Sequence, residues 1–404
     1  MEKEMKHENK FGMFIHWGVY ALVGYHEQAL ARLGMDRGEY EKLIYSFNPT
    51  EYDPEEWVLL AKNAGMKYIC ITTKHHDGFC MWDTKYTDYN IMNIPYGKDV
   101  IAMLAEACHK HGMLLSFYYS NPDWHHEYGF NPTSTHQWPS AWPDKPNTEA
   151  YREYVKGQVK ELLTNYGPIY TFFWDIPPRI YDPSMNELVR SLQPDIIIND
   201  RGWDEGDFST PEREYESTSG KRFSRMTEAC NSLGAQSWGY RKGENLYSMR
   251  HLIRSIDQIM SMGGSYLLNV GPDEKGVIRP EYTKRLNYIA DWYLRMEGCL
   301  EGTEEDPFDY KIHNDKYIAN KKNGKTYLHF YDGLHSDSVA IESYPSLPKS
   351  VRLMNTGKTL DYKVEALPEF FNYYNGKAER VFLHIKQIPV DELANEAIVI
   401  EIEW

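Results

Sequence analysis

Residues 68–73 read YICITT, residues 100–111 read VIAMLAEACHKH, and residues 114–119 read LLSFYY. These three segments decide the fold. The first and third are short and apolar, which is typical of buried strands. In the middle segment apolar residues recur every three or four positions, which indicates a helix with one buried face, and Gly112 is a usual residue for ending it. Strand, helix and strand in this order predict two parallel strands joined by a helix.

The same alternation extends over the first three quarters of the 404 residues. Two further helices are expected to begin at Asp53-Pro54 and Asp182-Pro183, with the carboxylate as cap and proline in the first turn. The pattern fits a TIM-like (β/α)8 barrel with one or two strands unassigned. An open doubly wound sheet is the alternative, although no glycine-rich phosphate turn follows the first strand. The expected strands are Met13–His16, Tyr68–Thr73, Leu114–Tyr119, Tyr170–Trp174, Ile196–Asn199 and Tyr266–Val270.

The sequence changes character near residues 299–307. Short apolar segments then alternate with turn signals such as Asn323-Gly324 and Asn375-Gly376, which predicts an antiparallel β-sandwich. We therefore expect a barrel over residues 1–303 and a small β-sandwich domain over residues 304–404. The clearest strands expected there are Tyr327–Tyr331, Val339–Ile341, Val381–Ile385 and Ala397–Ile402.

Composition argues against several classes of function. The net charge of −15 argues against binding to nucleic acid or to an anionic membrane, because both need a basic surface. No segment approaches the roughly 18 apolar residues of a membrane-spanning helix. Five widely spaced cysteines without a CxxC pair indicate reduced thiols. The start, MEKEMKHENK, has no apolar signal segment, so we expect a cytoplasmic protein, although a chain trimmed of its leader would look the same.

Polar and ionisable residues gather where the expected strands end, which is where parallel barrels carry their active sites. Asp175 ends a strand of mostly aromatic residues, where packing gives no reason for a carboxylate. A helix cap is the structural alternative, but Ile176-Pro177-Pro178 follow and no helical pattern begins before Asp182. Asp175 is therefore a candidate catalytic carboxylate.

A second carboxylate is easy to find and hard to choose. A retaining glycosidase needs two carboxyl groups about 5–5.5 Å apart. Aromatic residues make up 14% of the chain, and their rings suit the faces of sugars. The loop that follows Arg201 offers six acids: Asp204, Glu205, Asp207, Glu212, Glu214 and Glu216.

The histidine pairs allow two interpretations. His75-His76-Asp77 and His125-His126 could be metal ligands, but no HEXXH spacing occurs, and adjacent residues on an extended strand point to opposite sides. We favour hydrogen bonding to sugar hydroxyls, because imidazole can donate or accept. A metal-dependent barrel hydrolase stays open as an alternative.

Seven segments together resemble glycoside hydrolase family 29, the α-L-fucosidases. They occur in the order of the family and cover nearly the whole expected barrel, so their combination is more specific than any one of them. The segments are FGMFIHWG (11–18), TTKHHDGF (72–79), YYS (118–120), NDR (199–201), GDFSTPE (206–212), SWGYR (237–241) and GGSYLLNVGP (263–272).

The resemblance implies a retaining, exo-acting α-L-fucosidase that uses no metal or other cofactor. By position, Asp175 resembles the nucleophile and Glu212 the general acid/base, a choice that the composition of the loop cannot make. Gln28 stands where the family often has an aromatic residue, so one wall of the sugar pocket differs. The residues that resemble the substrate-binding set are His16, Glu27, His75, His76, Tyr118 and Arg201.

The expected partner is thus a fucosylated oligosaccharide or glycoconjugate, with no nucleic acid and no membrane. A homo-oligomer is compatible with the sequence. A retaining glycosidase for another sugar, such as an α-L-galactoside, differs only in the pocket for C6 and stays open. A sugar-binding protein without activity is disfavoured, because both candidate carboxylates are present.

Overall fold

The structure, a computed structural model, describes residues 10–129, 147–178, 180–213, 222–368 and 380–404. The chain forms two compact units. Of the described residues, the first unit contains those within 10–213, 225–246 and 265–287, and the second contains those within 222–224, 247–264 and 288–404. Segments from before residue 303 therefore belong to the second unit as well. The boundary between residues 303 and 304 stays a prediction.

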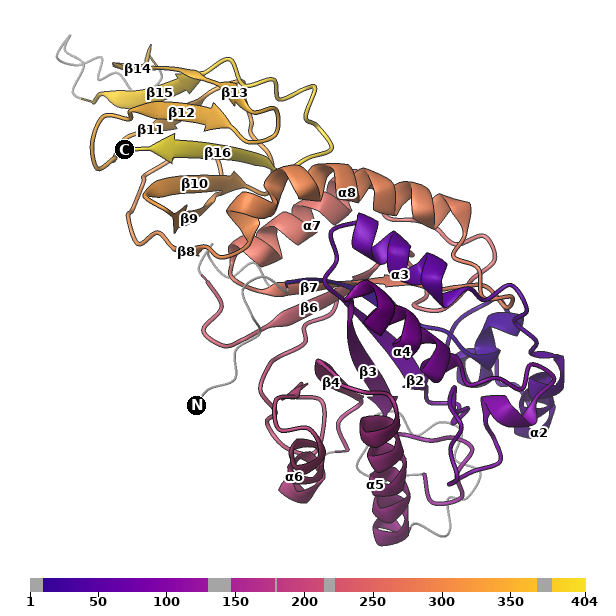
Figure 1. Cartoon of the computed structure of the whole chain (residues 1–404). Helices are drawn as coiled ribbons and strands as arrows, with labels where there is room; N and C mark the ends of the chain where they lie inside the picture. Colours follow the sequence, from indigo (N-terminus) through magenta and orange to yellow (C-terminus); the bar gives the residue numbers. More distant parts are fainter. Residues whose placement is uncertain (1–9, 130–146, 179, 214–221, 369–379) are drawn as a thin grey trace. The chain divides into compact units, whose positions relative to one another are not determined.

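A seven-stranded parallel sheet forms the centre of the first unit, in the order β5-β4-β3-β2-β1-β7-β6. Figure 1 labels β2, β3, β4, β6 and β7 of this sheet. Single parallel bridges join Phe208 to Asn199 beside β5, and Ser209 and Glu212 to Thr227 and Cys230 at β6. The segment 208–212 thus lies between the two outer strands and completes a TIM-like barrel, which confirms the predicted class. The strands are β1 (Phe11–Ile15), β2 (Tyr68–Lys74), β3 (Leu114–Ser120), β4 (Thr171–Asp175), β5 (Ile197–Ile198), β6 (Glu228–Ser232) and β7 (Ser265–Val270).

Sequence signals at the helix ends are confirmed. The Asp53 carboxylate accepts the backbone N–H groups of Glu55 and Glu56, and Asp182 caps its helix through Ser184. Gly112 ends its helix with φ 66°, a left-handed conformation that favours glycine. The α-helices are α1 (Ala29–Arg32), α2 (Arg37–Glu41), α3 (Pro54–Asn63), α4 (Val100–His111), α5 (Thr148–Asn165), α6 (Pro183–Leu192), α7 (Met249–Ser261) and α8 (Pro280–Leu300). Short 3-10 helices are η1 (Val19–Leu22), η2 (Lys42–Ser46) and η3 (Ile91–Asn93).

Two parts of the barrel were missing from the sequence prediction. Strand β6 reads EACNS, and the closing segment 208–212 reads FSTPE. Both are mainly polar, so neither has the apolar pattern that marks a strand. All five residues of β6 are nevertheless buried, because this strand faces other parts of the barrel on both sides. The six expected strands exist, and their ends differ from the prediction by at most two residues.

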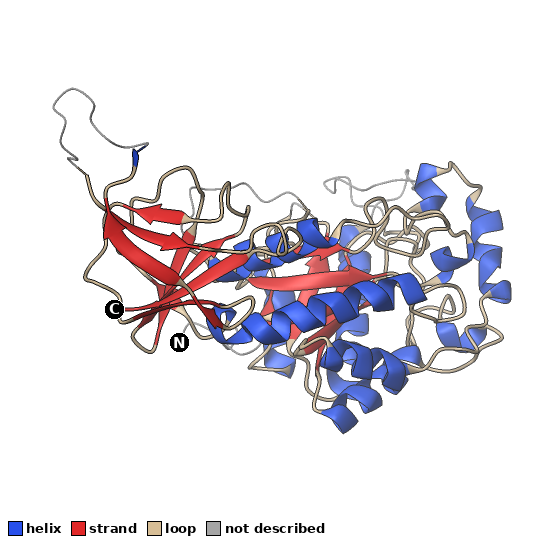
Figure 2. Cartoon of the chain, turned by 90° about the horizontal axis from the view of Figure 1, so that it is seen from above, coloured by secondary structure: helices blue, strands red, loops and turns tan. Residues whose placement is uncertain are grey.

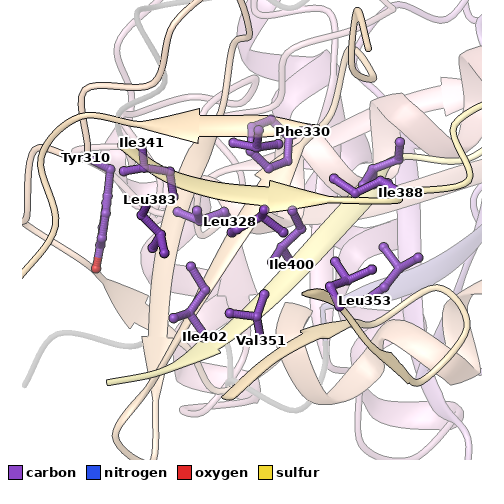
Figure 3. Close-up of a cluster of buried hydrophobic side chains, with 14 of the residues drawn as sticks. Tyr310, Leu328, Phe330, Ile341, Val351, Leu353, Leu383, Ile388, Ile400 and Ile402 are labelled. Atoms are coloured by element: carbon purple, nitrogen blue, oxygen red, sulfur yellow. The ribbon is translucent and has the colours of Figure 1, made fainter. Parts of the chain in front are cut away.

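The strands of the second unit form a β-sandwich (red arrows in Figure 2), as predicted. A six-stranded antiparallel sheet, β13-β12-β16-β10-β9-β8, packs against the sheet β11-β15-β14. Leu328, Ile400 and Leu383 come from both sheets and meet in one buried cluster (Figure 3). The strands are β8 (Glu304–Glu305), β9 (Ile318–Lys322), β10 (Lys325–Phe330), β11 (Val339–Ile341), β12 (Ser350–Leu353), β13 (Lys358–Thr359), β14 (Asp361–Glu365), β15 (Phe382–Lys386) and β16 (Ile398–Glu403). Among the described residues, none of the helices has both the length and the apolar character needed to cross a membrane.

Candidate active site

A cavity of about 380 Å³ opens in the first unit where the barrel strands end. It is the place where a parallel barrel gathers side chains from several strands. Its walls include Phe14, Phe173 and Trp238, so aromatic rings face the same space as the polar groups. All eight residues expected at the site line this cavity: His16, Glu27, His75, His76, Tyr118, Asp175, Arg201 and Glu212.

One guanidinium nitrogen joins the two candidate carboxylates. Nη1 of Arg201 lies 3.2 Å from Oδ1 of Asp175 and 2.5 Å from Oε1 of Glu212. These two oxygens are therefore less than about 6 Å apart, which is compatible with the close pair of carboxyl groups that a retaining glycosidase needs. On its other side, Arg201 donates to the side chain and carbonyl oxygen of Thr210, which holds the guanidinium in place.

Asp175 is held in its ionised form. Burial by itself raises the pKa of this carboxyl, because only 8% of the residue is exposed. The nearby Arg201 and His76, together with the Tyr118 hydroxyl that donates to Oδ2 at 2.6 Å, outweigh burial and hold the pKa below its ordinary value. Glu212 is placed differently, since 44% of its side chain is exposed to solvent.

Hydrogen bonds fix the ring orientation of two histidines. Nδ1 of His16 lies 2.7 Å from Oδ1 of Asn269, and an amide oxygen only accepts, so Nδ1 carries the proton. Burial lowers the pKa of His16 to about 4, so the ring is neutral at physiological pH and Nε2 is an acceptor. Nδ1 of His76 lies 2.7 Å from the Ser120 hydroxyl, which itself donates to the Pro122 carbonyl. His76 therefore donates from Nδ1, and its Nε2 lies 3.8 Å from Oδ2 of Asp175.

The expectation that adjacent histidines point to opposite sides is wrong for His75 and His76. Strand β2 ends at Lys74, and the chain turns at once, with the Gly78 N–H donating to the His75 carbonyl. Both rings consequently line the cavity, with centroids 4.0 Å apart.

The second histidine pair lies outside the cavity lining. His125 contacts Glu41 at 2.8 Å, and the His126 ring packs against Tyr154. Across the described ranges, no group of three His, Cys, Asp or Glu side chains is arranged to hold a metal ion.

Glu27 joins two loops at the edge of the cavity. It is 2% exposed, and its Oε2 accepts from the Ser237 hydroxyl and from the backbone N–H groups of Trp238 and Gly239. Sequence reasoning placed Glu27 in the pocket but missed the residues that orient the histidines, Ser120 and Asn269. Ser120 ends β3, Asn269 lies in β7, and both are buried. A polar residue in a buried strand is the sequence signal that could have found them.

Comparisons with known proteins agree with this geometry. The sequence profile of the family described as Alpha-L-fucosidase matches residues 2–298. The tissue alpha-L-fucosidase of Rattus norvegicus is 27% identical over 330 residues, which cover 72% of this chain and 68% of the relative. The alpha-L-fucosidase of Dictyostelium discoideum is 26% identical over 378 residues, which cover 83% of this chain and 79% of the relative.

Solved structures extend the likeness to the whole chain. Alpha-L-fucosidase isoenzyme 1 from Paenibacillus thiaminolyticus has a TM-score of 0.82 at 30% identity and covers 98% of this chain and 97% of its own. The Thermotoga maritima alpha-fucosidase in complex with fucose has a TM-score of 0.76 at 26% identity, with 99% and 97% covered. The resemblance seen in the sequence is confirmed, and the chain belongs to the α-L-fucosidase family of glycoside hydrolases.

Proposed function

We propose that this α-L-fucosidase releases terminal fucose with retention of configuration, with Asp175 as nucleophile and Glu212 as general acid/base. The observation that carries the proposal is the single nitrogen of Arg201 that contacts both carboxylates. A buried, ionised carboxylate and a solvent-accessible one that share a nitrogen lie close together, which supports double displacement.

The reaction then has two steps. Asp175 attacks the anomeric carbon while Glu212 gives its proton to the departing glycosidic oxygen, so the C–O bond to the aglycone breaks and a fucosyl ester of Asp175 forms. Water then attacks the same carbon, Glu212 takes a proton from the water, and the ester bond to Asp175 breaks. Two inversions at one carbon return fucose with its original configuration.

The rest of the cavity suits a sugar with one apolar corner. His16 offers a neutral acceptor nitrogen to a ring hydroxyl, and His76 directs Nε2 toward the same space. The aromatic walls, Phe14, Phe173 and Trp238, provide apolar surface for the C6 methyl group of fucose.

The test is release of 4-nitrophenol from 4-nitrophenyl α-L-fucoside by the native enzyme, Asp175→Ala and Asp175→Asn, each with and without EDTA. We expect activity in the native enzyme alone, unchanged by EDTA, and slower release from the α-L-galactoside, whose C6 hydroxyl meets apolar rings. Proton NMR should show α-fucose as the first product. A first product in the β form, or substantial turnover by either variant, would contradict the proposal.

A further inference from the structure

Asn121 connects the chain segments that carry Asp175 and Arg201. It directly follows β3, and 4% of it is exposed. Its backbone N–H donates to the carbonyl of Asp175 at 3.0 Å. Its side-chain Nδ2 donates to the carbonyl of Ile176 at 3.1 Å and to the carbonyl of Arg201 at 3.3 Å. One residue from β3 thus binds the backbone at the ends of β4 and β5.

The backbone held by Asn121 is strained. Ile176 has φ 59°, a left-handed conformation that is rare for a β-branched residue. Such a conformation persists only where the surrounding structure enforces it. Ile176 is next to the proposed nucleophile and lines the cavity. A change in its backbone would therefore rotate the Asp175 carboxylate.

Asn121 is itself fixed from helix α5. The hydroxyl of Tyr151 donates to the Asn121 carbonyl at 2.5 Å, and Tyr151 is 3% exposed. Asn121 is therefore a rigid link between α5 and the two strand ends, and its amide has a defined orientation because both contacts of Nδ2 are to carbonyl oxygens.

We propose that Asn121 is a positioning residue for the hydrolytic reaction. It holds the carbonyl groups of Ile176 and Arg201 at a fixed separation, so that the Arg201 guanidinium reaches Asp175 and Glu212 at the same time. The inference rests on the proposed roles of these two carboxylates. Asn121 does not line the cavity, so its effect reaches the sugar only through the residues that it holds.

The chain offers a matched control in Asn90. This residue is 3% exposed, its Nδ2 also donates to two backbone carbonyls, those of Thr84 and Thr87, and it does not line the cavity. Asn90→Ala and Asn121→Ala should lower the unfolding temperature by similar amounts. If Asn121 acted only through stability, Asn121→Ala would change catalysis as little as Asn90→Ala does.

The experiment measures kcat and KM for 4-nitrophenyl α-L-fucoside from pH 3 to pH 8 in the native enzyme, Asn121→Ala, Asn121→Asp and Asn90→Ala. Asn121→Asp keeps the size of the side chain but replaces the donor nitrogen, which separates lost hydrogen bonds from lost packing. At a temperature at which thermal unfolding shows all four proteins to be folded, we expect kcat to fall about 100-fold in both Asn121 variants. KM should change less than kcat, and Asn90→Ala should keep the native kcat.

The second readout is the pH dependence of kcat/KM, which would not change if Asn121 had only a structural role. The acid limb of kcat/KM reports ionisation of the free nucleophile. Arg201, His76, Tyr118 and His16 surround Asp175, and all four hold its pKa down. Arg201 acts by its permanent charge, Tyr118 by its hydrogen bond, and the two imidazoles only when they are protonated. Displacing Arg201 should move the limb to higher pH by about one unit in Asn121→Ala, the variant that adds no new charge beside Asp175.

Native kcat in both Asn121 variants and an unmoved limb in Asn121→Ala would overturn the inference. The same holds if Asn121→Ala and Asn90→Ala lose activity equally. Asp175→Ala runs in parallel: if that variant keeps activity, the proposed nucleophile is wrong whatever Asn121 does. If Asp175→Ala is inactive while the Asn121 variants remain native in both readouts, only the positioning role fails.

Discussion

Glu228 provides a direct link between the barrel interior and the pH dependence of stability. The residue lies on β6 and is fully buried, and burial raises the pKa of its carboxyl from 4.5 to about 7. A hydrogen bond from the Tyr68 hydroxyl to Oε2, at 2.5 Å, opposes this rise without cancelling it. The folded protein therefore carries a neutral carboxylic acid in its core at mildly acidic pH.

The size of the effect follows from the pKa difference. Because the folded pKa lies above the unfolded one, the folded state keeps a proton that the unfolded state releases. The stabilisation is complete below about pH 4.5 and is lost as the pH rises through about 7. A difference of about 2.5 pKa units corresponds to roughly 3 kcal/mol. Glu228→Gln keeps the shape and the acceptor for Tyr68 but cannot ionise, so this part of the pH dependence should disappear.

The assay is thermal unfolding of the native enzyme and Glu228→Gln from pH 4.5 to pH 8, with Glu106→Gln, an exposed position on α4, as control. The variant should gain stability relative to the native enzyme as the pH rises, by roughly 3 kcal/mol in total and mostly between pH 5 and pH 7. Glu106→Gln should track the native enzyme throughout. A difference between native enzyme and Glu228→Gln that does not vary with pH would refute the reasoning.

Three further predictions concern the cavity. Arg201→Lys should lower kcat/KM by about 10²–10³-fold and move its acid limb to higher pH, because an ammonium cannot keep the bonds to Thr210 that hold the guanidinium between the two carboxylates. A pH–rate series measures both, and an unmoved limb would count against the ionising role. Glu212→Gln should slow hydrolysis of an unactivated fucosyl disaccharide about 10²–10⁴-fold, but should slow formation of the fucosyl-enzyme from an aryl fucoside far less. Stopped-flow measurements compare the two rates, and equal losses would exclude the acid role. Glu205→Gln is the control. Ser120→Ala should raise KM roughly tenfold, because His76 loses the oxygen that orients it; steady-state kinetics with a native KM would show that the ring needs no such support.

Much of the barrel could be predicted because its strands are either plainly apolar or bounded by strong signals. Asp53 and Asp182 mark the starts of their helices because each caps the helix by accepting nearby backbone N–H groups. These contacts are local, so no tertiary contact is needed to predict them. Strand β6 could not be found in this way, because Glu228 and Asn231 are buried polar residues whose environment comes from distant segments. The closing segment 208–212 contains a proline and makes only single bridges, so its position depends on both neighbouring strands.

The candidate site shows the same division. Asp175 could be singled out from a single strand, since a carboxylate at the end of an aromatic segment has no local explanation. Glu212 could not be chosen among six acids without the resemblance, because the deciding contact is with Arg201, eleven residues away and on another segment. His75 and His76 were expected to point to opposite sides, as adjacent residues of an extended strand do, whereas β2 ends at Lys74 and the turn that follows brings both rings together. Asn121 had no sequence signal, since its contacts are with the backbone at two other strand ends.

The most direct test of the account is to trap the fucosyl-enzyme and locate the modified residue. A 2-deoxy-2-fluoro fucoside with an activated leaving group slows the second step more than the first, so the ester accumulates. Mass spectrometry of the digested protein should find the added fluorofucosyl mass on the peptide that contains Asp175, in one copy per chain and in step with the loss of activity. The Asp175→Ala variant should carry no label. A label on any other residue, or full turnover without a covalent intermediate, would contradict the account.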